Sequence, residues 1–418
     1  MTGGRVSESP LLLRGGRVLD VGTGEMSLQD VAVRDGRLVR PSEVADAEVV
    51  DADGLTICFG LWDCHAHPGS LMYDPDARGR FEGPAEWAVR AGVNLMEAVA
   101  MGVTGVRVLG EADGIDVAWS RAFRAGLVPG PRLTCSGQAI RTTGGHGTAY
   151  PRTYVRVQAE TICDGPVEMT RAVRGLVERG VDWIKVMLTG GLYSERETVD
   201  GGQLTADELH AVVATATAKG VPVAAHCGSA RWATLFAELG GRSVEHGYAL
   251  DEAAAAAMAR SGTWLVPTIG VTHDVALMEA DGWPAHARER ALATAPGHAE
   301  AVRACLEAGV PLATGADLNP IGPRLHAELR MLERIGLDRL TVLRAATAGA
   351  RALNCLGEET APCPGSAADL LLLEGNPLDD LAVLERPAGV IVFGRFVIRP
   401  GGVSDDRQAD PCLPAAQP

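Results

Sequence analysis

The stretch TICFGLWDCHAH, residues 56–67, is a run of apolar residues that closes with two histidines. In a β-strand, residues two apart point to the same face, so His65 and His67 present both imidazoles to one side. Cys64, between them, faces the other way and is expected to pack against neighbours. A single strand histidine is more often a hydrogen-bonded core residue, but two at the end of a buried strand favour a functional site.

Short apolar runs of the same kind recur along the middle of the chain and alternate with segments of helical pattern. The seven further strand candidates are residues 104–110, 132–140, 183–188, 222–227, 243–247, 263–268 and 311–317. Residues 85–101 carry apolar side chains at helical spacing, and Thr205 with Glu208 forms a capping box that opens a helix ending at Lys219. Eight strands that alternate with helices predict an α/β fold, specifically a (β/α)8 TIM barrel.

Both ends of the chain have a different pattern, with short β-like runs separated by turn residues. The N-terminal part includes a hairpin turn predicted at Asp35-Gly36, and AADLLLLEG and GVIVFGRFVI near the other end look similar. We therefore expect a small β-sandwich domain built from both termini. The expected boundaries are residues 1–56 and 355–405 for the two parts of the sandwich, 57–354 for the barrel, and 406–418 for a disordered tail.

The composition excludes several classes of partner. The 418 residues carry a formal net charge of -15, so nucleic acid and anionic membrane surfaces have no electrostatic reason to bind. No apolar stretch approaches the roughly 20 residues that span a bilayer. The nine cysteines are odd in number and lack CxxC pairs, which argues against a disulfide framework and predicts a reducing, cytoplasmic setting.

Further polar residues stand at the ends of predicted strands, where barrel enzymes keep their catalytic groups. His226 ends VPVAAH, His246 ends RSVEH and Asp317 ends LATGAD, while Lys185 lies inside WIKVML. Imidazole and carboxylate groups without thiolates suit Zn²⁺, with Mn²⁺, Fe²⁺, Co²⁺ or Ni²⁺ as alternatives. Asp63 shares the strand face of the two histidines of HAH and is a candidate to orient a ligand.

Lys185 is unusual because the chain has only one other lysine, Lys219, among 38 lysines and arginines. An ammonium inside a buried strand has a lowered pKa, and a neutral amine is a nucleophile, which arginine cannot provide. Three interpretations remain open. Lys185 is paired with a carboxylate, or forms a Schiff base in a barrel lyase, or has captured carbon dioxide to become a carbamate that bridges two metal ions. Only the third uses all six polar residues.

These motifs resemble the amidohydrolase superfamily over nearly the whole chain. The matching pieces are GLWDCHAH, WIKVMLTGG, AAHCG, VEHG, VPT and TGAD, with VRDGRL, GSAADLLLLEGNPL and VIVFGRF from the termini. The likeness is strongest to the binuclear branch with a carboxylated lysine, and within it to Xaa-Pro dipeptidases, arginine carboxypeptidases and imidazolonepropionase-like proteins. Phe59-Gly60 stands where similar proteins carry Pro-Gly, and Arg107-Val108 where they often carry Arg-Asp.

The resemblance implies a role for each polar residue. It assigns two divalent metal ions, expected to be zinc, with the first held by His65, His67 and Asp317. It assigns the second to His226 and His246, with N-carboxylated Lys185 bridging both. A metal-bridging hydroxide is then the nucleophile, and Asp317 serves as general base and then general acid.

Two residues are expected on the substrate side. His146, in the loop GGHG, is a candidate to donate a hydrogen bond to the scissile carbonyl, and Tyr193 resembles the position that meets a substrate carboxylate. The predicted function is hydrolysis of C–N amide or peptide bonds in a dipeptide or N-acyl amino acid, by a homo-oligomer. The alternatives are a cyclic amide or lactone hydrolase, a deaminase, a lyase using Lys185, and a non-catalytic binding protein.

Overall fold

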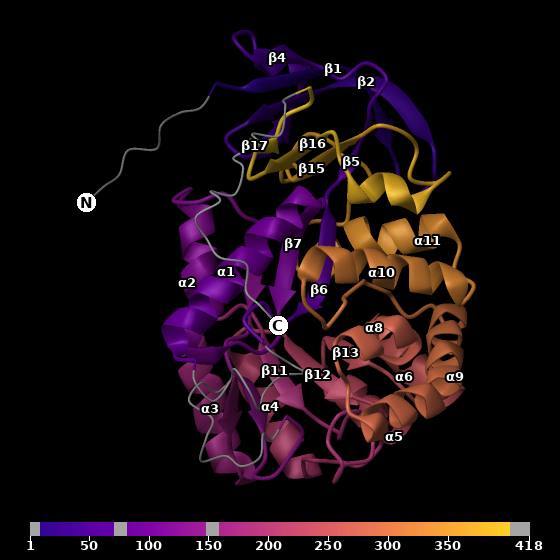
Figure 1. Ribbon diagram of the computed structural model, residues 1–418. Coiled ribbons are helices and arrows are strands. Elements are labelled where there is room, and N and C mark those ends of the chain that lie inside the picture. The colour runs from indigo at the N-terminus through magenta and orange to yellow at the C-terminus, as the bar shows by residue number, and fades with distance from the viewer. Residues whose placement is uncertain (1–8, 71–81, 148–158, 402–418) are drawn as a thin grey trace, which may run out of the picture.

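The computed structural model describes residues 9–70, 82–147 and 159–401 (Figure 1). Its N-terminal and C-terminal segments meet in one mixed sheet of eight strands, at the top of the view. These strands are β1 (Leu11–Leu19), β2 (Met26–Arg34), β3 (Arg37–Val39), β4 (Glu48–Asp51), β5 (Thr56–Phe59), β15 (Leu370–Leu373), β16 (Gly389–Val392) and β17 (Arg395–Ile398). Their order is β17-β16-β15-β5-β1-β2-β3, with β4 paired to β1.

This terminal sheet is held by apolar residues from both ends of the chain. Leu13, Ile57 and Leu370 are fully buried in one cluster, and β15 pairs with β5 in antiparallel register. The turn between β2 and β3 is the predicted one: Asp35 and Gly36 have φ of 50° and 76°, as a two-residue hairpin turn requires. Both termini therefore share a sheet, whereas its arrangement as a sandwich and the domain boundaries stay predictions. The expected tail at residues 406–418 lies outside the described residues.

The named strands between the terminal segments all pair in parallel. They are β6 (Leu61–Ala66), β7 (Val103–Val108), β8 (Arg132–Cys135), β9 (Ala139–Arg141), β10 (Glu160–Ile162), β11 (Ile184–Met187), β12 (Val223–Cys227), β13 (Ser243–His246) and β14 (Trp264–Val266). One sheet has the order β6-β7-β8 and the other β10-β9-β11-β12-β13-β14. Most of these strands are short, apolar and buried throughout, as expected for parallel strands covered on both faces. The predicted α/β class with parallel sheets is confirmed.

The strand predicted at residues 56–67 is divided in two by Gly60. Before this residue the chain pairs within the terminal sheet, and after it within the parallel sheet. The amide of Gly60 donates to Asp369 O at 3.0 Å, whereas the amide of Leu61 donates to Gly102 O at 3.1 Å. A Cβ atom at Gly60 would lie 2.0 Å from the Thr104 hydroxyl, so a side chain does not fit where the backbone changes partners.

The strand predicted at residues 311–317 is not a regular strand in the structure. Its backbone still bonds to both neighbours, because the amide of Leu265 in β14 donates to its first carbonyl at 2.9 Å. On the other side, the amide of Cys64 in β6 donates to Thr314 O at 2.8 Å. Asp317 ends the extended conformation with a φ of 66°. The segment lies between β14 and β6, and a closed eight-stranded barrel stays a prediction.

Helices occupy most of the connections between the parallel strands (Figure 1). They are α1 (Pro84–Ala100), α2 (Ile115–Arg124), α3 (Gly165–Arg179), α4 (Ala206–Ala218), α5 (Ala230–Glu238), α6 (Glu252–Ser261), α7 (Gly270–His273), α8 (Val275–Ala280), α9 (Ala285–Glu307), α10 (Ile321–Arg334), α11 (Arg339–Arg344) and α12 (Ala350–Leu353). Shorter helical turns cover Pro41–Glu43, Ala112–Gly114, Ala345–Gly349 and Leu381–Glu385. Among the described residues, no helix combines the length and apolar character needed to cross a membrane.

Two predicted helices are confirmed, and their packing positions the strands. Helix α1 begins and ends one residue before the helix predicted at 85–101, and it buries Leu95 and Val99. Helix α4 begins with the predicted capping box, in which the Glu208 carboxylate accepts from the Thr205 amide at 2.7 Å. The buried apolar side chains of these helices pack against those of the parallel strands, and together they form the largest apolar cluster among the described residues.

Strand alternation places Lys185 on the opposite side of β11 from this apolar layer. Ile184 and Val186 both belong to the large cluster of buried apolar residues. Because alternate side chains of a strand face opposite ways, the intervening lysine points to the inner side.

Candidate metal centre

Polar side chains gather at the carboxyl ends of the parallel strands, and they are the six predicted from the sequence. They are His65 in β6, His67 directly after it, Lys185 in β11, His226 in β12, His246 at the end of β13, and Asp317 after the segment 311–317. Parallel strands end at the same edge, so residues far apart in the sequence meet there. We call these six residues the polar cluster.

Asp317 holds one half of the polar cluster together. Its Oδ1 lies 3.1 Å from Nε2 of His67 and 3.4 Å from Nε2 of His65. The Nζ atom of Lys185 lies 3.4 Å from the same nitrogen of His65. Four predicted residues therefore point their polar atoms at a common position.

The remaining two histidines complete the polar cluster. The ring centroids of His65 and His246 are 4.8 Å apart, and those of His226 and His246 are 4.4 Å apart. One ligand atom each from His65, His246 and Asp317 falls within 4.8 Å of the others, a spacing compatible with a shared cation. The structure brings the six residues together, and their roles as ligands stay predictions.

Each imidazole is fixed through the nitrogen that faces away from the others. The partners are Glu245 Oε2 for His65 Nδ1 (2.9 Å), Gly110 O for His67 Nδ1 (3.0 Å), Gly190 O for His226 Nε2 (3.0 Å) and Thr268 Oγ1 for His246 Nδ1 (2.6 Å). A nitrogen that faces a carbonyl or carboxylate oxygen carries the hydrogen, which leaves a lone pair on the second nitrogen. Metal-binding histidines are oriented in this way.

Burial keeps most of these rings neutral. It lowers the pKa of His65, His226 and His246 well below 6.5, and for His65 and His226 the positive charge of Lys185 adds to the effect. Burial also acts to lower the pKa of His67, but the hydrogen bond with Asp317, the negative charge of Asp317 and the hydrogen bond to Gly110 O together outweigh it and raise that pKa. Neutral rings are the form that binds a cation.

Lys185 has the environment in which a lysine loses its proton. Its side chain is 1% exposed, and burial lowers its pKa to about 8, although Glu245 and Asp317 act in the opposite direction. Among the described residues, its polar contact within hydrogen-bond range is the His65 ring. The interpretation of Lys185 as the partner of a carboxylate therefore receives no support from a direct ion pair.

Three residues at the site have a backbone conformation that L-residues seldom adopt. The φ angles of His246, Thr268 and Asp317 are 69°, 48° and 66°. Such strain is maintained only where the surroundings fix it, and it concentrates at functional sites. Although Glu245 and His246 are consecutive, both lie next to His65: Glu245 bonds to its Nδ1, and the ring of His246 lies 4.8 Å from its ring.

Glu245 and Arg107 form a buried pair beneath the polar cluster that sequence analysis did not identify. Arg107 donates through Nη2 to Glu245 Oε1 at 2.9 Å, through Nη1 to Ser243 Oγ at 2.9 Å and through Nε to Cys64 O at 2.6 Å. Both charged side chains are fully buried. The sequence contains a signal for this pair, because it has an arginine inside TGVRVLG and a glutamate inside SVEHG. Charged side chains in buried strands need partners.

Asp63 holds the backbone of the site and does not contact a histidine ring. Its Oδ1 accepts from the amides of His65 at 3.0 Å and Ala316 at 3.1 Å, which joins β6 to the segment 311–317. Burial raises the pKa of Asp63 to about 7. Its expected part in orienting a ligand is therefore exerted through the main chain.

His146 lies beside the polar cluster. Its ring stacks on His226 with centroids 4.1 Å apart and planes at 25°, and its Nδ1 lies 2.7 Å from Glu197 Oε2. The Glu197 carboxylate also accepts from the amide of Gly191 at 3.1 Å. This contact fixes one ring nitrogen and leaves Nε2 for another partner. Glu197 was not predicted, because nothing in TGGLYSERE distinguishes it from Glu195.

Tyr193 lies in a loop that is tied to helix α9. His286 Nε2 lies 2.8 Å from Tyr193 O, and Arg290 donates to Leu192 O at 3.1 Å. The rings of Tyr193 and His286 meet edge to face at 6.5 Å. Tyr193 is thus part of the loop that follows β11 and packs against α9. Its predicted contact with substrate stays a prediction.

Tyr248 is a buried neighbour of the site that the sequence analysis did not select. Its ring stacks on His246 with centroids 5.1 Å apart and planes at 12°, and it meets His298 edge to face. Burial, with a smaller effect of Asp317, raises the pKa of its hydroxyl well above 10. Tyr248 therefore supports the ring of His246 as a neutral phenol.

A parallel α/β fold with histidines and an aspartate at its carboxyl edge defines a class of hydrolase, and comparison with known proteins agrees. The model of the amidohydrolase family matches residues 56–397. The chain belongs to the amidohydrolase family, which confirms the resemblance deduced from its motifs.

The chain is also similar to individual proteins that carry the names of enzymes. The ochratoxinase of Aspergillus niger is 31% identical over 354 residues, covering 79% of this chain and 72% of the relative. A prolidase crystallised with N-methylphosphonate-L-proline is 30% identical, with a TM-score of 0.84 over 93% of this chain and all of that one. A Xaa-Pro dipeptidase with bound methionine is 27% identical, with a TM-score of 0.82 over 93% and 99% of the two chains.

Proposed function

We propose that this chain is a binuclear metal-dependent hydrolase of C–N amide bonds, with a dipeptide or N-acyl amino acid as substrate. One observation carries the proposal: four imidazoles, each held through one ring nitrogen by a neighbouring oxygen, gather with Lys185 and Asp317 at one edge of the parallel strands. The proposed framework is a (β/α)8 barrel at residues 57–354. The hydrogen bonds of the segment 311–317 to both neighbouring strands support its closure.

The residues fit a pair of divalent metal ions. We propose that His65, His67 and Asp317 hold the first ion, and that His226 and His246 hold the second, with N-carboxylated Lys185 between them. Four imidazoles, a carboxylate and no thiolate form a donor set that suits zinc. When bound, such ions lower the pKa of water toward neutrality and polarise the scissile carbonyl.

Lys185 fits the carbamate because burial lowers the pKa of its amine to about 8, so far more of it is neutral and able to react with carbon dioxide than in an exposed lysine. The ammonium first loses one proton, and the neutral amine then forms an N–C bond with carbon dioxide and releases a second proton, so a cation becomes an anion. A buried anion at this position would complement the charge of two cations, whereas a buried ammonium would repel them.

Asp317 is proposed to move the proton. It lies at the centre of one half of the polar cluster, with Oδ1 within 3.4 Å of two ring nitrogens. In the proposed mechanism its carboxylate accepts a proton from the attacking water and donates it to the leaving nitrogen. The C–N bond then breaks to give an amine and a carboxylic acid.

His146 is proposed to stabilise the carbonyl oxygen. Glu197 fixes Nδ1 and the stacking on His226 fixes the plane of the ring, so Nε2 points from a constant position. A hydrogen bond donated there would stabilise negative charge that develops on the oxygen. Neither His146 nor Glu197 belongs to the polar cluster.

The proposed substrate carries a free carboxylate next to the scissile bond. Two relatives bear names of dipeptide hydrolases, and the ligand of the prolidase presents the carboxylate of proline. Tyr193, on the loop held by His286 and Arg290, is the proposed contact for this group.

The test is a screen of dipeptides and N-acyl amino acids with protein supplied with Zn²⁺ and bicarbonate. We expect turnover of substrates with a free α-carboxylate and about two equivalents of metal per chain. Turnover of the matching carboxamides at the same rate would contradict the substrate class. Full activity after complete metal removal, or trapping of Lys185 by borohydride, would overturn the metal-dependent mechanism.

A further inference from the structure

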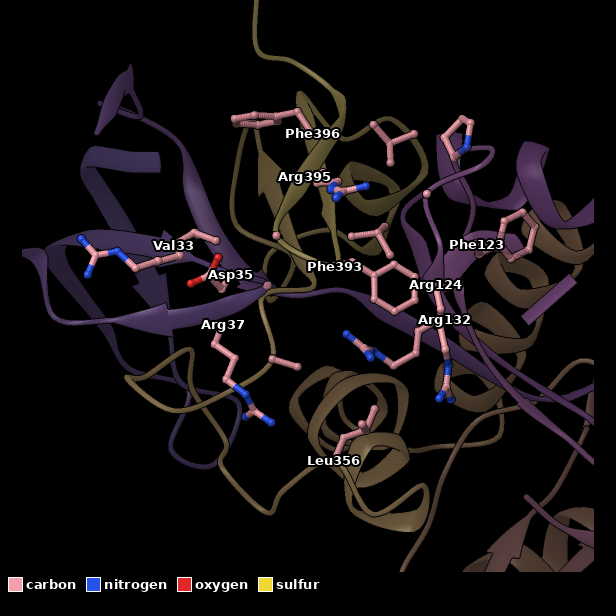
Figure 2. Close-up of a pocket in the computed structure, with 18 of the residues that line it drawn as sticks. Val33, Asp35, Arg37, Phe123, Arg124, Arg132, Leu356, Phe393, Arg395 and Phe396 are labelled. Atoms are coloured by element: carbon pink, nitrogen blue, oxygen red, sulfur yellow. The ribbon is translucent and has the colours of Figure 1, made fainter. Parts of the chain in front are cut away.

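A cavity of about 920 Å³ lies away from the polar cluster, between the terminal sheet and the start of β8 (Figure 2). It is lined by residues of the β2–β3 hairpin, the end of α2, β8, the segment after α12, and β17. Arg132 opens β8, whereas the polar cluster lies where the parallel strands end. The cavity is therefore at the opposite edge of the parallel sheet, and its volume is in the range of small-molecule sites.

The walls of the cavity are rich in arginine, in contrast to the acidic chain as a whole. The arginines are Arg34, Arg37, Arg124, Arg132 and Arg395, and the carboxylates are Asp35 and Glu359. One of these carboxylates is already engaged, since Glu359 Oε2 lies 3.6 Å from the buried guanidinium of Arg351. A concave surface with an excess of one sign of charge concentrates ions of the opposite sign.

Contacts with the protein fix several of the arginines. Arg132 makes a bidentate pair with Asp369, at 2.7 and 3.2 Å, and its guanidinium lies 4.3 Å from the centre of the Phe393 ring. Arg37 donates through Nη1 to Gly365 O at 2.8 Å, which leaves its other nitrogens for a ligand. The guanidinium of Arg395 covers Gly126, where a Cβ atom would lie 2.4 Å from Nη1.

The cavity also has an apolar wall. Three of the six phenylalanines of the chain, Phe123, Phe393 and Phe396, line it together with Leu356. Figure 2 shows these side chains among the arginines, with contributions from the N-terminal hairpin on one side and the C-terminal strands on another. A ligand with charged groups alone would not use this part of the surface.

We propose that this cavity binds a small organic polyanion, with at least two phosphate or carboxylate groups on an apolar or aromatic body. Guanidinium groups bind both kinds of oxyanion through paired hydrogen bonds. Arginines that come from the hairpin, α2, β8 and β17 require a ligand with more than one anionic group to contact them together. The site is separate from the proposed catalytic site and does not depend on its function.

Titration calorimetry of the full chain at physiological salt tests the proposal, with ATP, benzene-1,3,5-tricarboxylate and adenosine as probes. We expect ATP or benzene-1,3,5-tricarboxylate to bind with a Kd below 1 mM, the first indicating a phosphate ligand and the second a carboxylate ligand. Adenosine, which lacks the anionic groups, should not bind measurably. The absence of binding by both anions would overturn the proposal.

Variants locate the binding. Arg37→Ala with Arg124→Ala removes one arginine from each side of the cavity, and should weaken binding at least about tenfold, because hydrogen bonds to charged groups are lost. The matched control is Arg171→Ala with Arg174→Ala, two exposed arginines on α3 outside the cavity. Equal weakening in both double variants, or unchanged affinity in the cavity variant, would contradict a site here.

Cys355 provides a readout in the unmodified protein. It is exposed and lines the cavity, whereas Cys363 does not line it. At a ligand concentration ten times the Kd, alkylation of Cys355 should slow about tenfold, as mapped by peptide mass spectrometry. Cys363 should react at an unchanged rate. Equal slowing of both cysteines would mean that the ligand acts elsewhere.

Discussion

Glu245 Oε2 lies 2.9 Å from Nδ1 of His65, although the two residues are 180 positions apart in the sequence. The same carboxylate accepts two hydrogen bonds from Arg107, so its position is fixed from a third strand. His65 is thereby held with Nε2 toward Asp317 and Lys185. Glu245 is a positioning residue that connects the buried charge pair to the proposed metal site.

Replacing this carboxylate by an amide tests that connection. In Glu245→Gln the side chain keeps its size, but Arg107 loses its counter-charge and His65 loses its anionic acceptor. We expect zinc affinity to fall about 10- to 100-fold, the usual effect of removing a partner of a metal-binding histidine. Competition with a chelator measures this change.

The control is Glu238→Gln, which alters an exposed glutamate on α5. It should leave zinc affinity unchanged. If Glu245→Gln bound zinc as tightly as the unmodified protein, Glu245 would have no part in positioning His65.

The sequence predicted the elements of the fold better than their connections. Alternation of apolar strands and helices was sufficient for the α/β class, because burial on both faces leaves a clear apolar pattern. The break at Gly60 was not predicted, since it depends on contact with Thr104 from another strand. The irregular segment 311–317 was also read as a strand, because its positive φ at Asp317 arises from tertiary contacts.

The residues of the candidate site were also predicted only in part. The six residues of the polar cluster were predicted, because histidine, lysine and aspartate at strand ends contrast with their apolar neighbours. Glu245, Glu197 and Tyr248 were not, since their roles depend on which strand or loop lies opposite. The arginine-lined cavity could not be predicted either, because six separate segments of the chain contribute to it.

Asp317→Asn is expected to lower kcat about 10²- to 10⁴-fold, the range for loss of a general acid and base. Asparagine tolerates positive φ nearly as well as aspartate, so the backbone at φ 66° should be retained. Steady-state kinetics on the best dipeptide, with metal content measured in parallel, provides the test. Asp207→Asn, on the exposed first turn of α4, is the control. A kcat within twofold of the unmodified enzyme would exclude Asp317 as the proton carrier.

Glu197→Gln tests the support of His146. The amide keeps the shape but removes the negative charge 2.7 Å from Nδ1, so the ring loses its fixed orientation. We expect kcat to fall about tenfold or more. This loss corresponds to part of the transition-state stabilisation that one oxyanion contact provides. Metal content should not change, because neither residue is in the polar cluster. Glu178→Gln, which alters an exposed glutamate on α3, is the control, and an equal loss in both variants would exclude a specific role.

A pH effect on stability is expected from Glu328, a buried carboxyl that is not a member of the polar cluster. Burial raises the pKa of this carboxyl to about 8, from 4.5 in an exposed chain, against hydrogen bonds from the amides of Gly270 and Ile269. Between these values the folded state holds a proton that the unfolded state has released. Its contribution to stability is therefore present at low pH and is lost as pH rises toward 8.

Urea denaturation from pH 5 to pH 8 measures this effect. Glu328 should contribute a decrease in unfolding free energy of up to about 1.4 kcal/mol per pH unit. Glu328→Gln, which cannot ionise, should flatten the decrease, and Glu300→Gln on the exposed face of α9 should not. An identical slope in all three proteins would show that Glu328 is ionised in the folded state.

Lys185→Ala is expected to lower kcat/KM about a thousandfold or more, because loss of a bridging ligand removes several kcal/mol of transition-state stabilisation. Lys185→Arg should be equally inactive, since a guanidinium does not react with carbon dioxide and remains charged. The chain offers a matched control in Lys219→Ala, which removes the other lysine, exposed at the end of α4. That variant should keep full activity.

A short-chain carboxylic acid separates the carbamate from other roles of Lys185. The cavity left by Lys185→Ala has space for a small carboxylate at the position of the proposed carbamate, so added propionate should restore part of the turnover and of the metal content. Lys185→Arg, which fills that space, should not respond. Rescue by methylamine and not by propionate would instead show that Lys185 acts as an amine, and the bridging anion would have to be abandoned.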